Sequence, residues 1–443
     1  ASMTAFANMT RSELKTALDA LRSEYYNYKA QGLKLNMARG KPEAAQFDLS
    51  TPMLTNIATV EDCFSEDGTD CRNYGILDGL PEAKRLMAVM LDTEPENVFV
   101  YGNSSLLAMY DTLSRIMRFG VGDGKPWSSY RHGIKWICPV PGYDRHFAIC
   151  EEFGIDMIPV PLLEDGPDMD KVEALVASDA TIKGMWCVPK YSNPSGITYS
   201  DEVVRRLAHM STAADDFRIF WDNAYCVHHL YGPERQDQLM DIEKACNKAG
   251  HPNRYYKFAS TSKMTFSGAG IAAIATSPRN LADELAHLSL QTIGFDKINQ
   301  LRHARFLKDA DGIAEHMAKH ADILRPKFEL VQKRLSEGMQ DVTEASWSNP
   351  NGGYFVSFNA PKHTATRIVA LAKEAGVVLT GAGATWPYGS DPRDSNIRIA
   401  PSMPQLDELD KALSVFICCV KIAYTEKLLG EYFDAKESEG FFS

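Results

Sequence analysis

The segment Phe217-Arg218-Ile219-Phe220-Trp221-Asp222 predicts a buried strand that ends in a carboxylate. Its apolar run is typical of a strand in a parallel sheet that is covered on both faces. A charge at the mouth of such a strand is costly unless it is paired, and no neighbour in the sequence pairs it. Asp222 is therefore either a helix cap or a functional carboxylate whose partner is a ligand or a distant residue.

Similar apolar runs lie on both sides of this segment and alternate with helical stretches. The predicted strands are 97–101, 134–140, 184–188, 217–221, 256–259 and 270–275. The predicted helices between them are 106–118, 143–153, 201–211 and 278–290. This alternation predicts an α/β fold with a mostly parallel sheet and helices on both faces.

The pattern changes towards both ends of the chain. The further elements that we predict are helices at 11–31, 300–338 and 405–430 and strands at 354–358, 377–379 and 397–399. These elements predict a smaller α+β domain packed with the N-terminal helix. We divide the chain into 1–60 as an N-terminal arm and part of the small domain, 61–315 as the large domain and 316–443 as the C-terminal small domain.

Composition excludes some classes of partner. The 443 residues carry 47 Lys and Arg against 58 Asp and Glu, a formal charge of -11, so we expect no nucleic-acid partner. We expect no membrane partner, because the apolar stretch 413–424 is too short to span a bilayer. The nine cysteines form no C-x-x-C pair and no signal peptide opens the sequence, which indicates a cytoplasmic protein. The adjacent His228 and His229 lack companions at ligand spacing, so we predict no metal.

Lys263 is the second candidate for a functional residue. Ser260-Thr261-Ser262-Lys263 follows the predicted strand 256–259, and ligands of open parallel sheets bind at this end of the strands. A lysine among hydroxyls and small residues is poorly explained as a surface charge. Lysine also forms imines with carbonyl cofactors when its pKa is lowered.

Other strand ends carry weaker signals, each with an ordinary structural explanation. Ser104 and Ser105 open a predicted helix, as a phosphate cup or as a simple cap. Tyr143 follows a Pro-Gly turn and could stack on a planar ligand. Asn193 precedes a proline, as a turn residue or as a hydrogen-bond donor. Arg398 lies in a predicted apolar strand, where a planar carboxylate would suit it.

The order of these signals is more specific than any one of them. A hydroxyl pair, an aromatic, Asn-Pro, a strand-end Asp-x-x-Tyr, Ser-x-Ser-Lys and a C-terminal Arg follow one another along the chain. From about residue 36 to 402 the chain resembles the fold type I pyridoxal-phosphate enzymes and, among them, the class I aminotransferases. It is most similar to the bacterial aspartate-aminotransferase branch related to MocR-type proteins. The resemblance implies a large three-layer α/β/α domain, a smaller α+β domain, pyridoxal 5'-phosphate as cofactor, and a homodimer with active sites at the interface.

The resemblance also implies roles for residues. Lys263 would form the Schiff base with the cofactor and then carry protons, and Asp222 would keep the pyridine nitrogen protonated, with His146 supporting it. The other residues implied in cofactor binding are Ser104, Ser105, Tyr143, Asn193, Tyr225, Ser260, Ser262 and, across the subunit interface, Tyr74. Arg398 would bind the substrate α-carboxylate, and Gly40 and Arg39 would line the substrate pocket.

One departure from the family concerns the phosphate. Many relatives carry an arginine seven or eight residues after the lysine, where this chain has Gly270 and Ile271. Either serines and backbone amides hold the phosphate here, or a basic residue from elsewhere replaces that arginine.

The implied reaction is amino transfer from an α-amino acid, with aspartate as the best guess, to the 2-oxo acid 2-oxoglutarate. A dicarboxylate needs a second cation besides Arg398, and the candidates are Arg39, Lys41, Arg145 and Lys297. A carbon–sulfur β-lyase of the same fold stays open, because the lysine, aspartate and arginine are shared. A pyridoxal-phosphate-sensing regulator is disfavoured, because the motifs begin near residue 36 and leave no room for a DNA-binding module.

Overall fold

The large domain is built on an eight-stranded sheet in the order β2-β9-β8-β7-β6-β3-β4-β5. A computed structural model describes residues 4–431 of the chain. The strands are β2 (Val98–Val100), β3 (Lys135–Val140), β4 (Asp156–Leu163), β5 (Gly166–Pro167), β6 (Ile182–Cys187), β7 (Arg218–Asp222), β8 (Tyr255–Ser260) and β9 (Ala272–Thr276). Strands β8, β7, β6, β3 and β4 pair in parallel, and β9 is antiparallel to both β2 and β8. The predicted α/β class with a mostly parallel sheet is confirmed.

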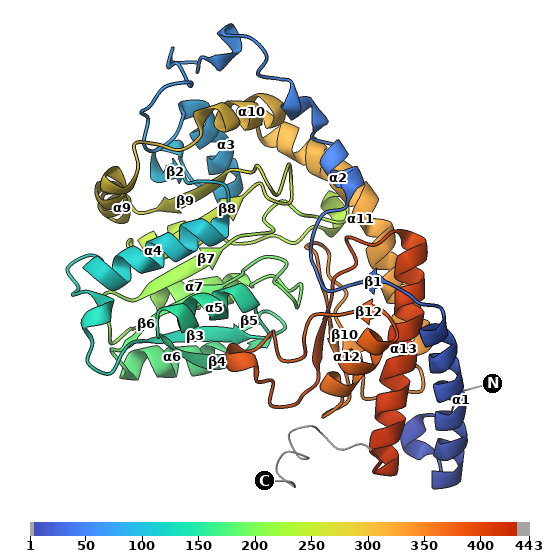
Figure 1. The fold of residues 1–443 in the computed structure, drawn as a ribbon. Coiled ribbons are helices and arrows are strands. Elements are labelled where there is room, and N and C mark those ends of the chain that lie inside the picture. The colour runs from blue at the N-terminus through green and yellow to red at the C-terminus, as the bar shows by residue number, and fades with distance from the viewer. Residues whose placement is uncertain (1–3, 432–443) are drawn as a thin grey trace.

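Alternation along β7 shows why helices cover both faces of this sheet. Phe220 packs with helices α4 (Ser105–Phe119), α5 (Asp144–Glu152) and α9 (Pro278–Gln291). Its neighbours Ile219 and Trp221 pack on the other face with α6 (Met169–Ser178), α7 (Asp201–His209) and α8 (Ile242–Lys248). Helix α3 (Pro81–Leu91) covers the β2–β9 edge of that face. The predicted three layers are therefore present (Figure 1).

The small domain combines two small sheets with long helices, as predicted. Strands β1 (Leu35–Asn36) and β12 (Val377–Val378) form a parallel pair, and β10 (Ser346–Trp347), β11 (Val356–Asn359) and β13 (Asn396–Ile399) form an antiparallel sheet. The helices are α1 (Arg11–Ala30), α12 (Ala365–Glu374) and α13 (Leu406–Leu429). Thr10 begins α1 with a capping box, and Arg11 donates to the carbonyl of Leu429 at 3.0 Å. The N-terminal helix thus packs with the C-terminal domain.

The predicted helical region 300–338 is two helices. Helix α10 (Lys297–Leu307) ends at Lys308, whose φ of 68° is left-handed, and Asp309 then caps α11 (Ala310–Gly338). Helix α11 contains Pro326 and passes from the large domain into the small one (Figure 1). The division of the chain at residues 60 and 315 stays a proposal; residues 1–3 and 432–443 of those ranges lie outside the described residues.

Between residues 4 and 431, no helix combines the length and the apolar character that a bilayer span requires.

Candidate active site

A cavity of about 200 Å³ lies at the carboxyl ends of the parallel strands. The predicted site residues that line it are Ser104, Ser105, Tyr143, Asn193, Asp222, Tyr225, Ser260, Ser262 and Lys263. They come from segments far apart in the sequence, because strands β2, β3, β6, β7 and β8 all end at this edge of the sheet. Strand-end position was thus the signal that located them.

Lys263 lies in the turn after β8 with its amine against a tyrosine. Its Nζ donates to Tyr225 Oη at 2.7 Å. Burial lowers the pKa of Lys263 to about 8, with Asp222 raising it and Arg398 lowering it by smaller amounts. Burial also raises the pKa of Tyr225, so its hydroxyl stays protonated. An amine with this pKa is partly uncharged near neutral pH, as a nucleophile or a base must be.

Asp222 ends β7 as a buried carboxylate with one oxygen engaged and one free. His146, from α5, donates through Nε2 to Asp222 Oδ2 at 2.8 Å, and its ring stacks on Trp186 at 4.3 Å. Asp222 Oδ1 is buried and has no hydrogen-bond partner among the described residues. An unpaired buried carboxylate oxygen is costly, so this atom calls for a donor from a bound group.

Hydroxyl groups gather at the other end of the cavity. Ser104 caps α4 by accepting from the amide of Leu107 at 3.2 Å, which orients the helix N-terminus towards the cavity. Ser260 Oγ donates to Ser262 Oγ at 3.0 Å, and Ser105 Oγ is buried without a partner among the described residues. A helix N-terminus with free hydroxyls suits a phosphate.

Lys263 is the one basic side chain among the described residues that line the cavity. The positions of Gly270 and Ile271, where many relatives have arginine, contribute no charge to it. Among the lining residues, hydroxyl groups of serines are the groups available to a phosphate, and which of the two alternatives applies stays a prediction.

Arg398 lies beside the cavity on β13. Its NH2 donates to the carbonyl of Ala38 at 3.0 Å and its NH1 to Asn193 Oδ1 at 3.4 Å. The guanidinium lies 4.4 Å above the ring of Phe355. A Cβ added to Gly40 would lie 2.3 Å from Phe355 Cζ, so Gly40 is required for this stacking. Burial lowers the pKa of Arg398.

Sequence reasoning missed Phe355 and its neighbour Tyr354. Tyr354 stacks at 5.9 Å from the ring of Tyr225, and Lys263 Nζ lies 5.2 Å above the Tyr354 ring. Both aromatics precede β11 and reach the site only because the small domain packs here. No local pattern distinguished them from core residues.

Several predicted residues do not line the cavity. Tyr74 is 80% exposed on the surface of its own chain. Lys297 is buried and donates to the carbonyl of Gly75 at 3.0 Å. Arg39, Lys41 and Arg145 are exposed. None of these four basic residues lines the cavity, so the cavity does not identify the residue that binds a second carboxylate of the substrate.

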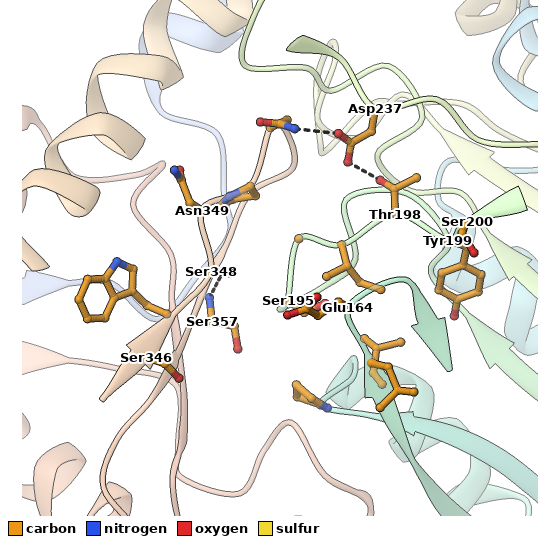
Figure 2. Close-up of a pocket in the computed structure, with 18 of the residues that line it drawn as sticks. Glu164, Ser195, Thr198, Tyr199, Ser200, Asp237, Ser346, Ser348, Asn349 and Ser357 are labelled. Carbon is orange, nitrogen blue, oxygen red and sulfur yellow. Dashed lines mark hydrogen bonds between the residues drawn. The ribbon is translucent and has the colours of Figure 1, made fainter. Parts of the chain in front are cut away.

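A larger cleft of about 950 Å³ lies between the two domains alongside this site. Figure 2 shows Ser346, Ser348 and Ser357 of the small domain across from Ser195 and Thr198 of the large domain. Ser195 belongs to the predicted Asn-Pro turn whose Asn193 lines the smaller cavity, and Ser357 pairs with Arg398 between β11 and β13. The substrate end of the site therefore borders a polar cleft.

In residues 4–431, no group of three or more His, Cys, Asp or Glu side chains could hold a metal ion. His229 Nδ1 lies 2.6 Å from Tyr191 Oη, whereas His228 packs against Tyr225.

The fold and this cavity define the class of protein: a fold type I pyridoxal-phosphate enzyme. A family model described as aspartate amino-transferase matches residues 9–432. The chain belongs to this family and, as a member of it, is a pyridoxal-phosphate-dependent aminotransferase.

Individual relatives agree with this family. The aspartate aminotransferase of Corynebacterium glutamicum is 44% identical over 92% of this chain and 93% of its own length. A crystal structure of an aspartate transaminase from Corynebacterium glutamicum superposes with a TM-score of 0.92 at 42% identity, covering 97% of this chain and all of that one. YcxD, an HTH-type transcriptional regulator of Bacillus subtilis, is 23% identical over 74% of this chain and 76% of its own length, in agreement with the predicted relation to MocR-type proteins.

The residues of the cavity fit the cofactor that the family requires. The two buried atoms without partners, Asp222 Oδ1 and Ser105 Oγ, lie where a protonated ring nitrogen and a phosphate would satisfy them. The lysine lies among the same lining residues.

Proposed function

We propose that this chain transfers the amino group of aspartate to 2-oxoglutarate in two half-reactions, with pyridoxal 5'-phosphate bound in the cavity of Lys263 and Asp222. The observation that carries the proposal is that a half-buried lysine amine and a buried carboxylate with one unpaired oxygen line the same cavity. The identity of 44% with an aspartate aminotransferase over most of both chains supports the choice of substrate.

Asp222 and His146 hold one end of the cofactor. Pyridoxal phosphate supplies a ring that withdraws electrons from the substrate Cα. Asp222 Oδ1 would accept a hydrogen bond from the protonated ring nitrogen, and keeping that nitrogen protonated favours the withdrawal. His146 donates to Asp222 Oδ2 at 2.8 Å, and this hydrogen bond fixes the orientation of the carboxylate.

Lys263 would hold the cofactor through its amine. Once free again, its Nζ would accept the proton of the substrate Cα and give it back in the transfer. Tyr225 Oη, 2.7 Å from Nζ, keeps the amine aimed into the cavity. Tyr225 and Asn193 would hydrogen-bond the cofactor's phenolic oxygen, Tyr143 would pack on its ring, and the four serines and the N-terminus of α4 would hold its phosphate.

Arg398 binds the α-carboxylate of the substrate. Its side chain is fixed by Ala38, Asn193 and the Phe355 ring, which leaves the guanidinium edge for a planar anion. Arg39 precedes Gly40 in the segment that contacts Phe355, and we assign it to the second carboxylate of aspartate.

We further propose a homodimer in which Tyr74 of the partner subunit contacts the phosphate. The loop of Tyr74 lies against the segment that follows α9, because Gly294 packs against the Gly75 carbonyl and Lys297 donates to it. That segment and the end of α9 also expose apolar side chains, with Leu290 90% exposed and Ile293 59%. Such a surface is typical of a contact between copies.

The test uses the purified chain loaded with pyridoxal phosphate. Aspartate alone should convert the yellow absorbance to that of the amine form, and 2-oxoglutarate should then restore it with release of glutamate. Lys263→Ala should abolish both steps. With a cysteine thioether in place of aspartate, release of a thiol, pyruvate and ammonia without any 2-oxo acid would instead establish the β-lyase. Sedimentation of the wild-type chain and of the Ile293→Asp variant tests the homodimer. If both sediment as monomers, the proposed homodimer is wrong.

A further inference from the structure

Three buried histidines surround the turn that carries Lys263. This lysine turn, residues 261–265, follows β8 and is closed by its own backbone bonds from Met264 and Thr265 to the Thr261 carbonyl. His303 from α10 reaches it on one side, and His316 and His320 from α11 reach it on the other. All three imidazoles are at most 5% exposed, so their hydrogen bonds form away from water.

His316 and His320 share one acceptor. Their Nε2 atoms lie 2.6 Å and 2.8 Å from the carbonyl oxygen of Met264, the residue after the lysine. Because a carbonyl only accepts, both Nε2 atoms carry a proton, and the 3.2 Å between them is no hydrogen bond. Burial lowers the pKa of both imidazoles, that of His320 to about 4, so they donate as neutral groups.

His303 takes the opposite tautomer. Its Nδ1 donates to the carbonyl of Asn299 at 2.8 Å, so its Nε2 is an acceptor. The hydroxyls of Thr261 and Thr265 lie 3.0 Å and 2.8 Å from that nitrogen. Burial lowers the pKa of His303 to about 4, which keeps this nitrogen unprotonated. The first and last residues of the lysine turn are thus held by one ring.

The network extends to the Lys263 peptide itself. Gln46, in α2 (Ala44–Asp48), donates to His320 Nδ1 at 3.1 Å and to Tyr354 Oη at 2.8 Å. Tyr354 Oη in turn donates to the carbonyl of Lys263 at 3.4 Å. The carbonyls of Lys263 and Met264 are therefore both held by groups outside the sheet.

We propose that His303, His316 and His320 are positioning residues that hold the lysine turn and thereby fix the Lys263 amine at Tyr225 Oη, inside the cavity. The inference rests on the proposed function, since it takes Lys263 as the reacting amine. Ser50 Oγ also donates to the Met264 carbonyl, at 3.4 Å, so each histidine that is lost removes one of its two short hydrogen bonds. A carbonyl with too few donors turns towards another one, and the lysine turn moves with it. The amine then leaves its buried place, and its pKa rises towards that of an exposed lysine.

The test measures Lys263 in the apoprotein. Carbamylation of Lys263 by cyanate, followed by peptide mass spectrometry across pH, reports the apparent pKa of the amine, and we expect a wild-type midpoint near 8. His316→Leu and His320→Leu should raise the midpoint by at least about half a unit, which slows carbamylation at pH 7 about threefold. His320→Gln, which keeps an N–H donor, should restore the wild-type profile.

His251→Leu is the matched control. It removes an imidazole that pairs with the Ala208 carbonyl at 2.8 Å, away from the lysine turn. Its melting temperature should fall as in the other leucine variants while the Lys263 profile stays as in wild type. Profiles of His316→Leu and His320→Leu that match this control would overturn the proposal. If His320→Leu does not fold, His316→Leu decides alone. If the wild-type chain fails to transaminate aspartate while the two leucine variants still show shifted carbamylation profiles, only the proposed substrate is refuted.

Discussion

Substitution of Gly40 by alanine isolates the contact that supports the substrate arginine. The φ of Gly40 lies outside the left-handed region, so alanine adds no backbone strain there. The added Cβ would lie 2.3, 2.7 and 3.3 Å from three atoms of the Phe355 ring. Ordinary contact begins at 3.4 Å, so the ring has to retreat by about 1 Å.

The magnitude follows from what surrounds that ring. Phe355 is 4% exposed and carries the Arg398 guanidinium at 4.4 Å, so it cannot move without displacing the arginine or the core. Overpacking of this kind costs about 1–3 kcal/mol. If most of that cost falls on the arginine, kcat/KM for aspartate drops roughly tenfold to hundredfold, mainly through KM, at about 1.4 kcal/mol per factor of ten.

The assay couples oxaloacetate formation to its reduction by malate dehydrogenase and records Tm in parallel. Gly268→Ala is the control, because Gly268 is exposed, has no left-handed φ and has nothing within 4 Å of an added Cβ. Phe355→Leu in the Gly40→Ala background should bring the raised KM partly back towards the wild-type value, because the smaller side chain gives room to the added methyl group. Kinetics of Gly40→Ala within twofold of wild type would refute the reasoning.

Other perturbations test single atoms of the site. Asp222→Asn removes the carboxylate that raises the pKa of Lys263, so in the apoprotein this pKa should fall below 8 by about one unit. Cyanate should then react faster with Lys263 at pH 7, while aminotransferase activity is lost. A slower reaction with cyanate would contradict the direction assigned to the effect of Asp222. Ser105→Ala should weaken pyridoxal-phosphate binding about fivefold in equilibrium dialysis, since it removes one phosphate hydrogen bond; unchanged affinity would exclude this serine. Arg39→Ala should raise KM for aspartate about tenfold and leave KM for alanine unchanged, because it removes a cation facing only a second carboxylate; equal effects would remove the assignment.

The sheet could be predicted where burial is continuous. The runs that became β3, β6, β7 and β8 are mostly apolar and almost continuously buried, and polar residues at their ends marked the cavity. Strand β4 was missed because Pro159 and Pro161 argue against a strand interior. Both prolines are accommodated because β4 lies beyond β3 near the edge and pairs with β5 at only two positions.

The site could be predicted only where one strand end supplies one residue. Asp222 and Lys263 stand out because a charge ends an apolar run. Phe355, Gln46 and the histidines of α10 and α11 gave no such signal, since their role depends on helix and domain packing. His316 and His320 share a helix face, a spacing equally typical of core residues.

Pro326 interrupts the backbone hydrogen bonding of α11. It lies six residues after His320 and before Arg334 and Gly338, which contact α13 of the small domain. A proline inside a helix removes one backbone hydrogen bond and lets the two halves bend against each other. The half that holds the lysine turn and the half that contacts the small domain therefore meet at a position where the helix lacks one backbone hydrogen bond.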